Sequence, residues 1–322
     1  MKKTALALVL ILILSLCACS GSEKYPMTIN GTGINEEIFR YFLDTAISDN
    51  PQATQDEIIN IVTEKSIRYV ALNTTFKVLE LTLTPAEEYA VSEKVNALWN
   101  VFGAYYEKAG VSKETFLKIH MNEAYTEKIR LFYFDTDGVT PFPEEELKTY
   151  FSENYVAFKL IKGYLYTSDV YGNMIEYTPE EQDIIYERYE HAVQQIKKGT
   201  SIEIMYASLA ETDQIIEQEL NTQVITSGDI HYPEGFFEAV LAIEEGEAGI
   251  CLFDDYIYLL SRIELFDTDE LFEKYRNECL KILTEEPLQQ EINIMCNEFT
   301  SIRNTKLIQK YYKEISEVRE NG

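Results

Sequence analysis

The sequence predicts an α+β protein in which a helical lobe, formed by both ends of the chain, holds an inserted module with the element order β-α-α-β-α-β-β. Three observations support this fold class. Helix-start signals recur through residues 28–140, strand-like segments are confined to residues 141–266, and helical patterns return in residues 267–322. The 14 glycines in 322 residues also fall below the average share of about 7%, which favours helices over turn-rich sheet.

The first helical segment, residues 28–140, is recognised by its caps. A short extended stretch with an Asn-Gly turn leads to Asn35, which precedes two glutamates and is a typical N-cap. Thr54 and Thr84 each begin a capping box, with a glutamate three residues later, and Ser112 caps a fourth helix. We therefore expect four helices, whose buried faces are set by apolar residues at helical spacing.

The middle segment, residues 141–266, alternates helix caps with strand-like runs. After a helix in PFPEEELKTYFSENY, a capping box at Thr178 predicts a second helix, and shorter ones are expected at Ile202–Leu209 and Phe236–Ile243. Aromatic and branched residues, which favour strands, dominate four runs: FKLIKGYLY, QVIT, GICLF and YIYLLSRIEL. This content predicts one compact α+β domain.

The last segment, residues 267–322, returns to helical patterns, with an expected break at Pro287. Since it follows the inserted domain, the simplest packing has these helices fold back on residues 28–140. The two terminal segments would then form one body.

The N-terminus has the layout of a secretory leader. Lys2 and Lys3 precede an apolar run that is too short for a spanning helix, which needs about 20 apolar residues. Leu16-Cys17-Ala18-Cys19 resembles the bacterial lipobox, in which the final cysteine is acylated and becomes the new N-terminus. We expect residues 1–18 to be a signal peptide, Cys19 the lipidation site and residues 19–27 a tether. An ordinary cleaved signal is the alternative. The mature chain would be extracytoplasmic and lipid-anchored to the bacterial cell membrane.

The charge balance restricts the partners. A formal net charge of −27 excludes nucleic acid, because phosphate neutralisation needs clustered Lys and Arg. The same charge repels anionic lipid headgroups, so we expect the folded part to stand off the membrane on its tether.

Cysteine and histidine spacing predicts neither a metal site nor a cofactor. Cys251, Cys279 and Cys296 lack CxxC spacing and are expected to be free thiols, with a Cys279–Cys296 disulfide as the alternative. The three histidines lie far apart in sequence, and no P-loop, GxSxG or HExxH motif is present.

Five segments together carry a family resemblance: INGTGINEEIFRYFL, YYEKAGVSKETFLKI, FPEEELKTYFSENY, AVQQIKKGTSIEIMYASLAE and EGFFEAVLAIEEGEAG. They resemble segments of the PrsA- and SurA-like foldases, extracytoplasmic chaperones whose terminal helices form a client-binding lobe around a parvulin-type prolyl isomerase domain. The match at EGFFEAVLAIEEGEAG is the most specific, because its Gly246-Glu247 turn lies at the expected distance from the final strand.

The resemblance also implies where a catalytic site would lie. Parvulins hold one His at the start of the first strand, another on the last strand, and a Cys or Asp near the peptide carbonyl. Here the first position falls on Gly163, or on Tyr164 if the register shifts by one, and the second falls on Tyr258. For the acidic position the loop offers Asp213, with two neighbours on each side as alternatives, and Phe236 corresponds to the pocket aromatic. Both histidine positions are therefore substituted, and the site is expected to be degenerate.

Three functions follow from these observations. The first is a chaperone or foldase that binds unfolded or nascent secreted polypeptides without needing catalysis. The second is an active peptidyl-prolyl isomerase that uses Tyr164, Tyr258 and Asp213 around Phe236. The third is a solute-binding or structural lipoprotein. Fold-level analogy alone does not decide among them.

Overall fold

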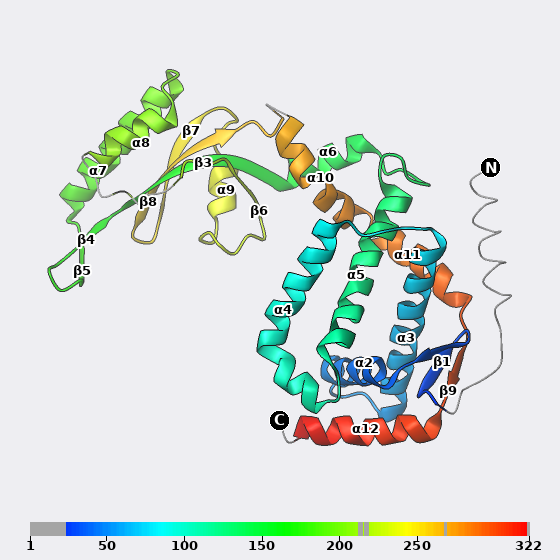
Figure 1. Cartoon of the computed structure of the whole chain (residues 1–322). Helices are drawn as coiled ribbons and strands as arrows, with labels where there is room; N and C mark the ends of the chain where they lie inside the picture. Colours follow the sequence, from blue (N-terminus) through cyan, green and yellow to red (C-terminus); the bar gives the residue numbers. More distant parts are fainter. Residues whose placement is uncertain (1–23, 212–214, 216–218, 267–268, 321–322) are drawn as a thin grey trace. The chain divides into compact units, whose positions relative to one another are not determined.

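The computed structural model describes residues 24–211, 215, 219–266 and 269–320, and it divides the chain into two compact units. The helical unit contains residues 1–142 and 280–322, and the α+β unit contains residues 143–279 (Figure 1). The mixed content of helices and antiparallel sheet confirms the α+β class. Within the described residues, no helix combines the length and apolar content that crossing a bilayer requires.

The helical unit begins with helices whose caps match the predictions. Asn35 accepts a hydrogen bond from the Ile38 amide, and Thr54 and Thr84 form complete capping boxes with Glu57 and Glu87. The helices of this unit are α2 (Glu36–Asp49), α3 (Gln55–Val78), α4 (Pro85–Lys108), α5 (Lys113–Phe134), α11 (Glu285–Asn297) and α12 (Thr305–Glu320).

A three-stranded sheet joins the two ends of the chain. Its order is β2 (Thr32–Ile34), β1 (Met27–Ile29) and β9 (Ser301–Arg303), and all pairs are antiparallel. The turn between β1 and β2 uses Asn30 and Gly31 at φ 42° and 80°, the left-handed region that favours Asn and Gly. Strand β9 was not expected from the sequence, because three residues are too few to show a period.

The core of the helical unit is built from both terminal segments. Ile308, Tyr311 and Ile315 of α12 are buried in one cluster with Phe39 and Leu43 of α2. The Phe39 and Tyr311 ring centroids lie 6.0 Å apart. The C-terminal helix therefore buries its apolar stripe against helices formed more than 250 residues earlier, as the sequence predicts for terminal segments that fold back on each other.

Charged groups fix this packing at its margin. Arg40 is 9% exposed, pairs with Glu36 and Glu314, and lies 4.6 Å from the centroid of the Tyr311 ring. Arg319 pairs with Asp44 at 2.7 Å. The Arg40–Glu314 and Arg319–Asp44 pairs both join α2 to α12. The buried charges of Arg40 and Asp44 on α2 are therefore neutralised by opposite charges on α12.

Helix α11 begins at Glu285, which corrects the expected break at Pro287. The break lies at Thr284, where the preceding helix ends, and Pro287 is the third residue of α11. Proline is tolerated there because amides in the first turn have no intrahelical acceptor. Arg130 of α5, only 2% exposed, donates hydrogen bonds to the Lys281 carbonyl, Thr284 and Glu285 at this break.

The α+β unit has the expected order β-α-α-β-α-β-β, with one additional hairpin. Its four-stranded antiparallel sheet has the order β6-β3-β8-β7, and β4 and β5 form the hairpin. The elements are α6 (Glu144–Asn154), β3 (Tyr155–Tyr164), β4 (Tyr166–Ser168), β5 (Met174–Glu176), α7 (Pro179–Lys197), α8 (Ile202–Ala210), β6 (Gln223–Thr226), α9 (Phe236–Leu241), β7 (Ala248–Phe253), β8 (Tyr256–Ile263) and α10 (Asp269–Leu283).

Most of α10 belongs to the α+β unit, which therefore ends later than residue 266. Its residue Phe272 packs on Phe151 of α6 with ring centroids 5.7 Å apart, and Arg276 pairs with Glu144 at 3.1 Å. The helical pattern alone could not show this, because the sequence does not state which unit an amphipathic helix buries its face against.

The sheet of the α+β unit separates two cores. Helices α7 and α8 cover one face, and α9 lies on the other (Figure 1). Ile161, Ile257 and Leu259 point towards α7 and α8, whereas Phe158 and Leu260 point towards α9. This alternation follows from the two-residue period of a strand.

We predict that Glu285→Gln lowers the free energy of unfolding of the helical unit at pH 7 by about 1 kcal/mol, since Glu285 is half exposed. The hydrogen bond from Arg130 holds the pKa of Glu285 below its usual value. This stabilisation is therefore complete above the usual pKa and is lost as pH falls through the lowered one. Urea unfolding at pH 7 and pH 3 measures the difference between wild type and variant.

The expected difference is smaller at pH 3 than at pH 7. Glu291→Gln on the same helix is the control and should change stability little at either pH. An equal effect of Glu285→Gln at both pH values would show that the stabilisation does not come from the ionised Glu285 paired with Arg130.

Candidate functional site

Three of the residues expected at a catalytic site lie on one face of the central sheet. In the register of β3 and β8, Lys162 lies opposite Tyr258 and Tyr164 lies opposite Tyr256. Cross-strand partners point to the same face, and α9 with Phe236 packs on that face. Tyr164, Tyr258 and Phe236 are therefore brought together, although they are far apart in sequence.

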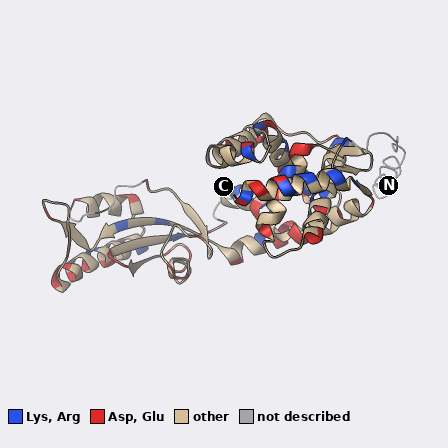
Figure 2. Ribbon diagram, turned by 90° about the horizontal axis from the view of Figure 1, so that it is seen from below, with Lys and Arg blue, Asp and Glu red and all other residues tan. Residues whose placement is uncertain are grey.

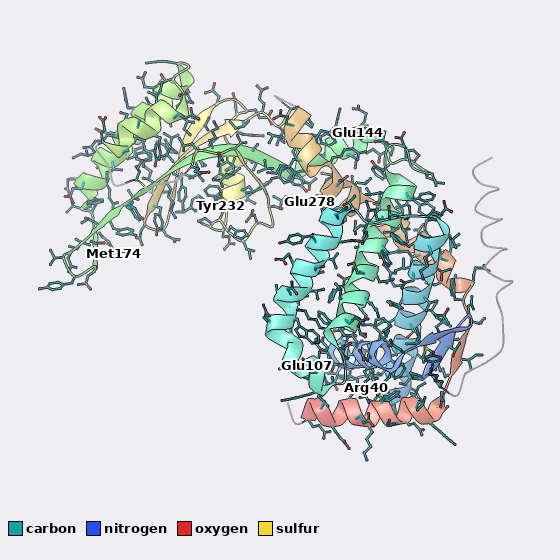
Figure 3. All side chains as sticks on the ribbon, viewed as in Figure 1. Arg40, Glu107, Glu144, Met174, Tyr232 and Glu278 are labelled. Atoms are coloured by element: carbon teal, nitrogen blue, oxygen red, sulfur yellow. The ribbon has the colours of Figure 1, made fainter. Side chains whose placement is uncertain are left out.

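These residues belong to a larger set of rings, which we call the aromatic face. Neighbouring ring centroids in it lie between 4.4 Å and 6.4 Å apart, the range of favourable aromatic pairs. Figure 3 shows Tyr232 beside α9. The aromatic face consists of Phe158, Tyr164, Tyr166, Tyr232, Phe236, Phe253, Tyr256 and Tyr258.

Phe236 forms the floor of the aromatic face and is 1% exposed. Its ring stacks on Tyr232 at 4.4 Å and contacts Tyr258 at 5.4 Å, and Phe158 and Phe253 complete the enclosure. A prolyl ring therefore reaches Phe236 only if one of these side chains moves. In this structure Phe236 is a core residue beneath the aromatic face rather than the wall of an open pocket.

Gly163 points to the opposite face of the sheet. A Cβ atom at this position would lie 2.2 Å from the Tyr189 hydroxyl oxygen of α7 and 3.2 Å from Ile257. The glycine is thus needed for the close approach of β3 and α7. Of the two alternatives for the first catalytic position, only Tyr164 lies on the aromatic face. Asp213 and Cys19 lie outside the described residues.

The outer part of the aromatic face is formed by half-buried tyrosines and one lysine. The Lys162 ammonium lies 3.6 Å from the centroid of the Tyr256 ring, within cation–π distance. Tyr166 contacts Tyr164 and Tyr256 with centroids 5.0 Å and 6.0 Å apart. Sequence reasoning missed Lys162, Tyr166 and Tyr256. The alternation of β3 and β8 places Lys162 and Tyr256 on the same face as Tyr164, and Tyr166, the first residue of β4, joins them through its ring contacts.

The environment of this face raises the pKa of Tyr258, Tyr166 and the Cys251 thiol. Burial raises the pKa of Tyr258 to about 12, and a hydrogen bond with Tyr256 raises the pKa of Tyr166 to about 12. Cys251 lies opposite Tyr258 in the sheet, and burial raises the pKa of its thiol to about 12. These groups can donate hydrogen bonds to a peptide carbonyl, but they do not supply a base or a thiolate nucleophile at pH 7.

The hairpin formed by β4 and β5 continues from the aromatic face and exposes apolar side chains. Val170 is 92% exposed and Tyr171 is 88% exposed, and Met174 and Ile175 are about half exposed. We call these four residues the hairpin tip; Figure 3 labels Met174 on it. Sequence reasoning missed this hairpin, although an Asp-x-x-Gly-Asn turn between alternating segments is a signal for it.

The turn that carries the hairpin tip is fixed by Asp169. Its carboxylate accepts hydrogen bonds from the Tyr171 and Asn173 amides and from the Asn173 side chain, each at 2.8 Å. Gly172 adopts φ 83°, which completes the tight turn. Val170 and Tyr171 are therefore held outward by a defined turn.

Gly163→Ala is predicted to destabilise the α+β unit by about 1 to 3 kcal/mol, because the added methyl group overlaps the Tyr189 hydroxyl. The change is measured by urea unfolding followed through the near-ultraviolet signal of the tyrosines.

Tyr189→Phe tests the cause. Tyr189→Phe should lower the free energy of unfolding less in the Gly163→Ala background than in wild type, with a coupling of about 1 kcal/mol between the two positions. Additive effects of the two substitutions would show that the overlap is relieved in another way.

Comparisons with known proteins find structural neighbours only. No protein-family model matches the sequence, and no curated protein matches it. The foldase protein PrsA from Streptococcus pneumoniae aligns over 90% of this chain and 91% of its own, with 13% identity and a TM-score of 0.35. PrsA from Bacillus subtilis aligns over 85% of this chain and 86% of its own, with 12% identity and a TM-score of 0.29. These values do not establish membership of that family.

Proposed function

We propose that this protein is an extracytoplasmic, membrane-anchored chaperone or foldase that binds unfolded secreted polypeptides. The observation that carries the proposal is the hairpin tip, where Val170 and Tyr171 are 92% and 88% exposed and continue directly from the aromatic face. Contiguous exposed apolar side chains are uncommon on soluble domains and typically mark interaction surfaces.

The chemistry of this surface suits a ligand of variable sequence. Burial of a side chain such as Val170 or Met174 contributes about 1.5 to 3 kcal/mol. The turn fixed by Asp169 lowers the entropy lost on binding, since the tip is already ordered. Tyrosine gives a large contact area with few rotatable bonds, and methionine adapts to different partners. Such a surface can bind exposed apolar segments of many different sequences.

Electrostatics adds a preference among clients. A net charge of −27 attracts basic polypeptide segments and repels acidic ones. The attraction is long-ranged and is screened by salt, with a Debye length of about 8 Å at physiological ionic strength. Association with a basic client should therefore weaken as salt is added, whereas the apolar contacts should not.

The proposed location follows from the leader. Acylation of Cys19 after removal of residues 1–18 would anchor the chain to the outer face of the bacterial cell membrane, where secreted polypeptides emerge unfolded. Two acyl chains hold a protein durably, whereas one does so only marginally. Anchoring and polypeptide binding together define a foldase placed at the site of secretion.

Prolyl isomerisation is a second candidate function. It is favoured by the position of the Tyr164 and Tyr258 hydroxyls, both hydrogen-bond donors, on one face of the sheet, since catalysis must weaken the resonance of an X-Pro amide against a barrier of about 18 to 20 kcal/mol. The enclosure of Phe236 argues against it, because a ring that is 1% exposed and covered by Tyr232 does not offer an open apolar wall to the prolyl ring. Binding without catalysis therefore has the stronger support.

An aggregation assay tests the leading function. The purified chain should suppress aggregation of a reduced, carboxymethylated model protein, and Val170→Ser with Tyr171→Ser should weaken this about tenfold, because two anchoring side chains lose their apolar surface. The matched control is Ile204→Ser with Ile230→Ser, which changes aliphatic residues of the same unit that are 58% and 90% exposed.

The two functions give different outcomes. Suppression that survives in the double variant would contradict the proposed surface. Acceleration of a proline-limited refolding reaction that is lost in Tyr258→Phe would favour the isomerase instead.

A further inference from the structure

Basic residues are unevenly distributed in this acidic chain. The sequence contains 55 acidic and 28 basic residues, yet residues 24–35 and 299–313 contain five basic residues and no Asp or Glu. The five are Lys24, Arg303, Lys306, Lys310 and Lys313, and we call them the basic edge. Both segments belong to the helical unit.

The sheet brings the two segments together. Met27 lies opposite Arg303 in the β1–β9 register, and the Asn304 amide donates a hydrogen bond to the Pro26 carbonyl at 2.9 Å. Lys24 precedes Pro26 by two residues, and Lys306 follows Asn304 by two. The first described residue of the chain is therefore close to the start of α12.

Helix α12 presents its lysines away from the core. Ile308, Tyr311 and Ile315 are buried, whereas the lysines at 306, 310 and 313 are exposed and follow helical spacing on the opposite side. Figure 2 views the molecule from below and shows basic residues recurring along α12.

Most of this charge is weakly compensated. Among the described residues, Lys310 pairs with Glu314 at 3.8 Å and Lys313 with Glu317 at 3.7 Å, both long distances for an ion pair, and the Lys310 ammonium also lies 5.1 Å from the centroid of the Tyr311 ring. Glu314 also pairs with Arg40, so its charge is shared. Among the described residues no carboxylate pairs with Lys24 or Lys306, and Arg303 donates to the neutral Asn60 side chain.

The basic edge lies where the chain would leave the membrane. Cys19 precedes Lys24 by five residues, which span at most about 18 Å when fully extended. Anionic headgroups attract juxtamembrane lysines and arginines within a Debye length, about 8 Å at physiological salt. A short tether from an acylated Cys19 would hold the basic edge close to this zone, while the acidic remainder of the surface is repelled.

We propose that the basic edge is a docking surface for anionic phospholipid, which orients the helical unit with α12 against the membrane. This inference rests on the lipid anchor of the proposed function. It also revises the expectation that the folded part stands away from the lipid: the net charge repels the membrane, but the face at the tether is attracted to it. Each lysine near an anionic surface strengthens the attraction about fivefold.

Amine labelling of the membrane-purified chain tests the proposal. The chain is reconstituted through its N-terminus into vesicles of phosphatidylcholine alone or with 30% phosphatidylglycerol, treated briefly with acetic anhydride, and analysed by mass spectrometry. Lys306, Lys310 and Lys313 should be labelled at least threefold more slowly on the anionic vesicles. Lys77 and Lys94, on α3 and α4, should react equally on both.

A charge-reversal variant supplies the control. Lys306→Glu with Lys310→Glu and Lys313→Glu should abolish the difference in labelling at Lys24. The matched variant Lys77→Glu with Lys113→Glu and Lys118→Glu should preserve it. Equal labelling of α12 on both vesicles overturns the docking surface while leaving the anchor intact. Loss of the protein from both vesicle types on washing overturns the anchor itself.

Discussion

The structure depends on the closure of the helical unit by its two chain ends. Strand β9 pairs with β1, and Ile308, Tyr311 and Ile315 of α12 complete a core begun by α2. Arg40 neutralises carboxylates from both ends at the margin of that core. Because this closure leaves residues 143–279 as a separate unit, it also allows the α+β unit to present its own surfaces. Without the last helix, the apolar faces of α2 and α3 would be open to water.

Local signals in the sequence predicted most of the elements. The caps at Asn35, Thr54 and Thr84 mark helix starts because a side-chain oxygen must satisfy a free amide, a requirement that is independent of tertiary structure. The unit that α10 joins, the break at Thr284 and strand β9 could not be predicted, since they are fixed by contacts distant in sequence. The hairpin was missed although its turn signal is present.

The candidate site was likewise predicted in part from local signals, whereas the rest depends on tertiary contacts. Alternation along β3 and β8 was sufficient to group Tyr164 with Tyr258, but only packing shows that Phe236 is enclosed and that Gly163 is required by Tyr189. Two positions that the catalytic pattern selects have structural roles instead: Gly163 allows β3 and α7 to approach closely, and Phe236 fills a core. The side chains exposed at the hairpin tip are apolar or aromatic, and such side chains typically form interaction surfaces. The proposed foldase thus combines an exposed apolar hairpin with a basic edge near the proposed tether, in residues 24–35 and 299–313, which contain no Asp or Glu.

Hydrogen exchange on the full chain, with and without a saturating unfolded polypeptide, tests the central claim most directly. Binding through the hairpin tip predicts slower exchange of the amides in residues 164–176, where the exposed backbone would be covered, and little change in α7, on the opposite face of the sheet. Unchanged exchange in residues 164–176 under conditions where the polypeptide is bound would contradict the account.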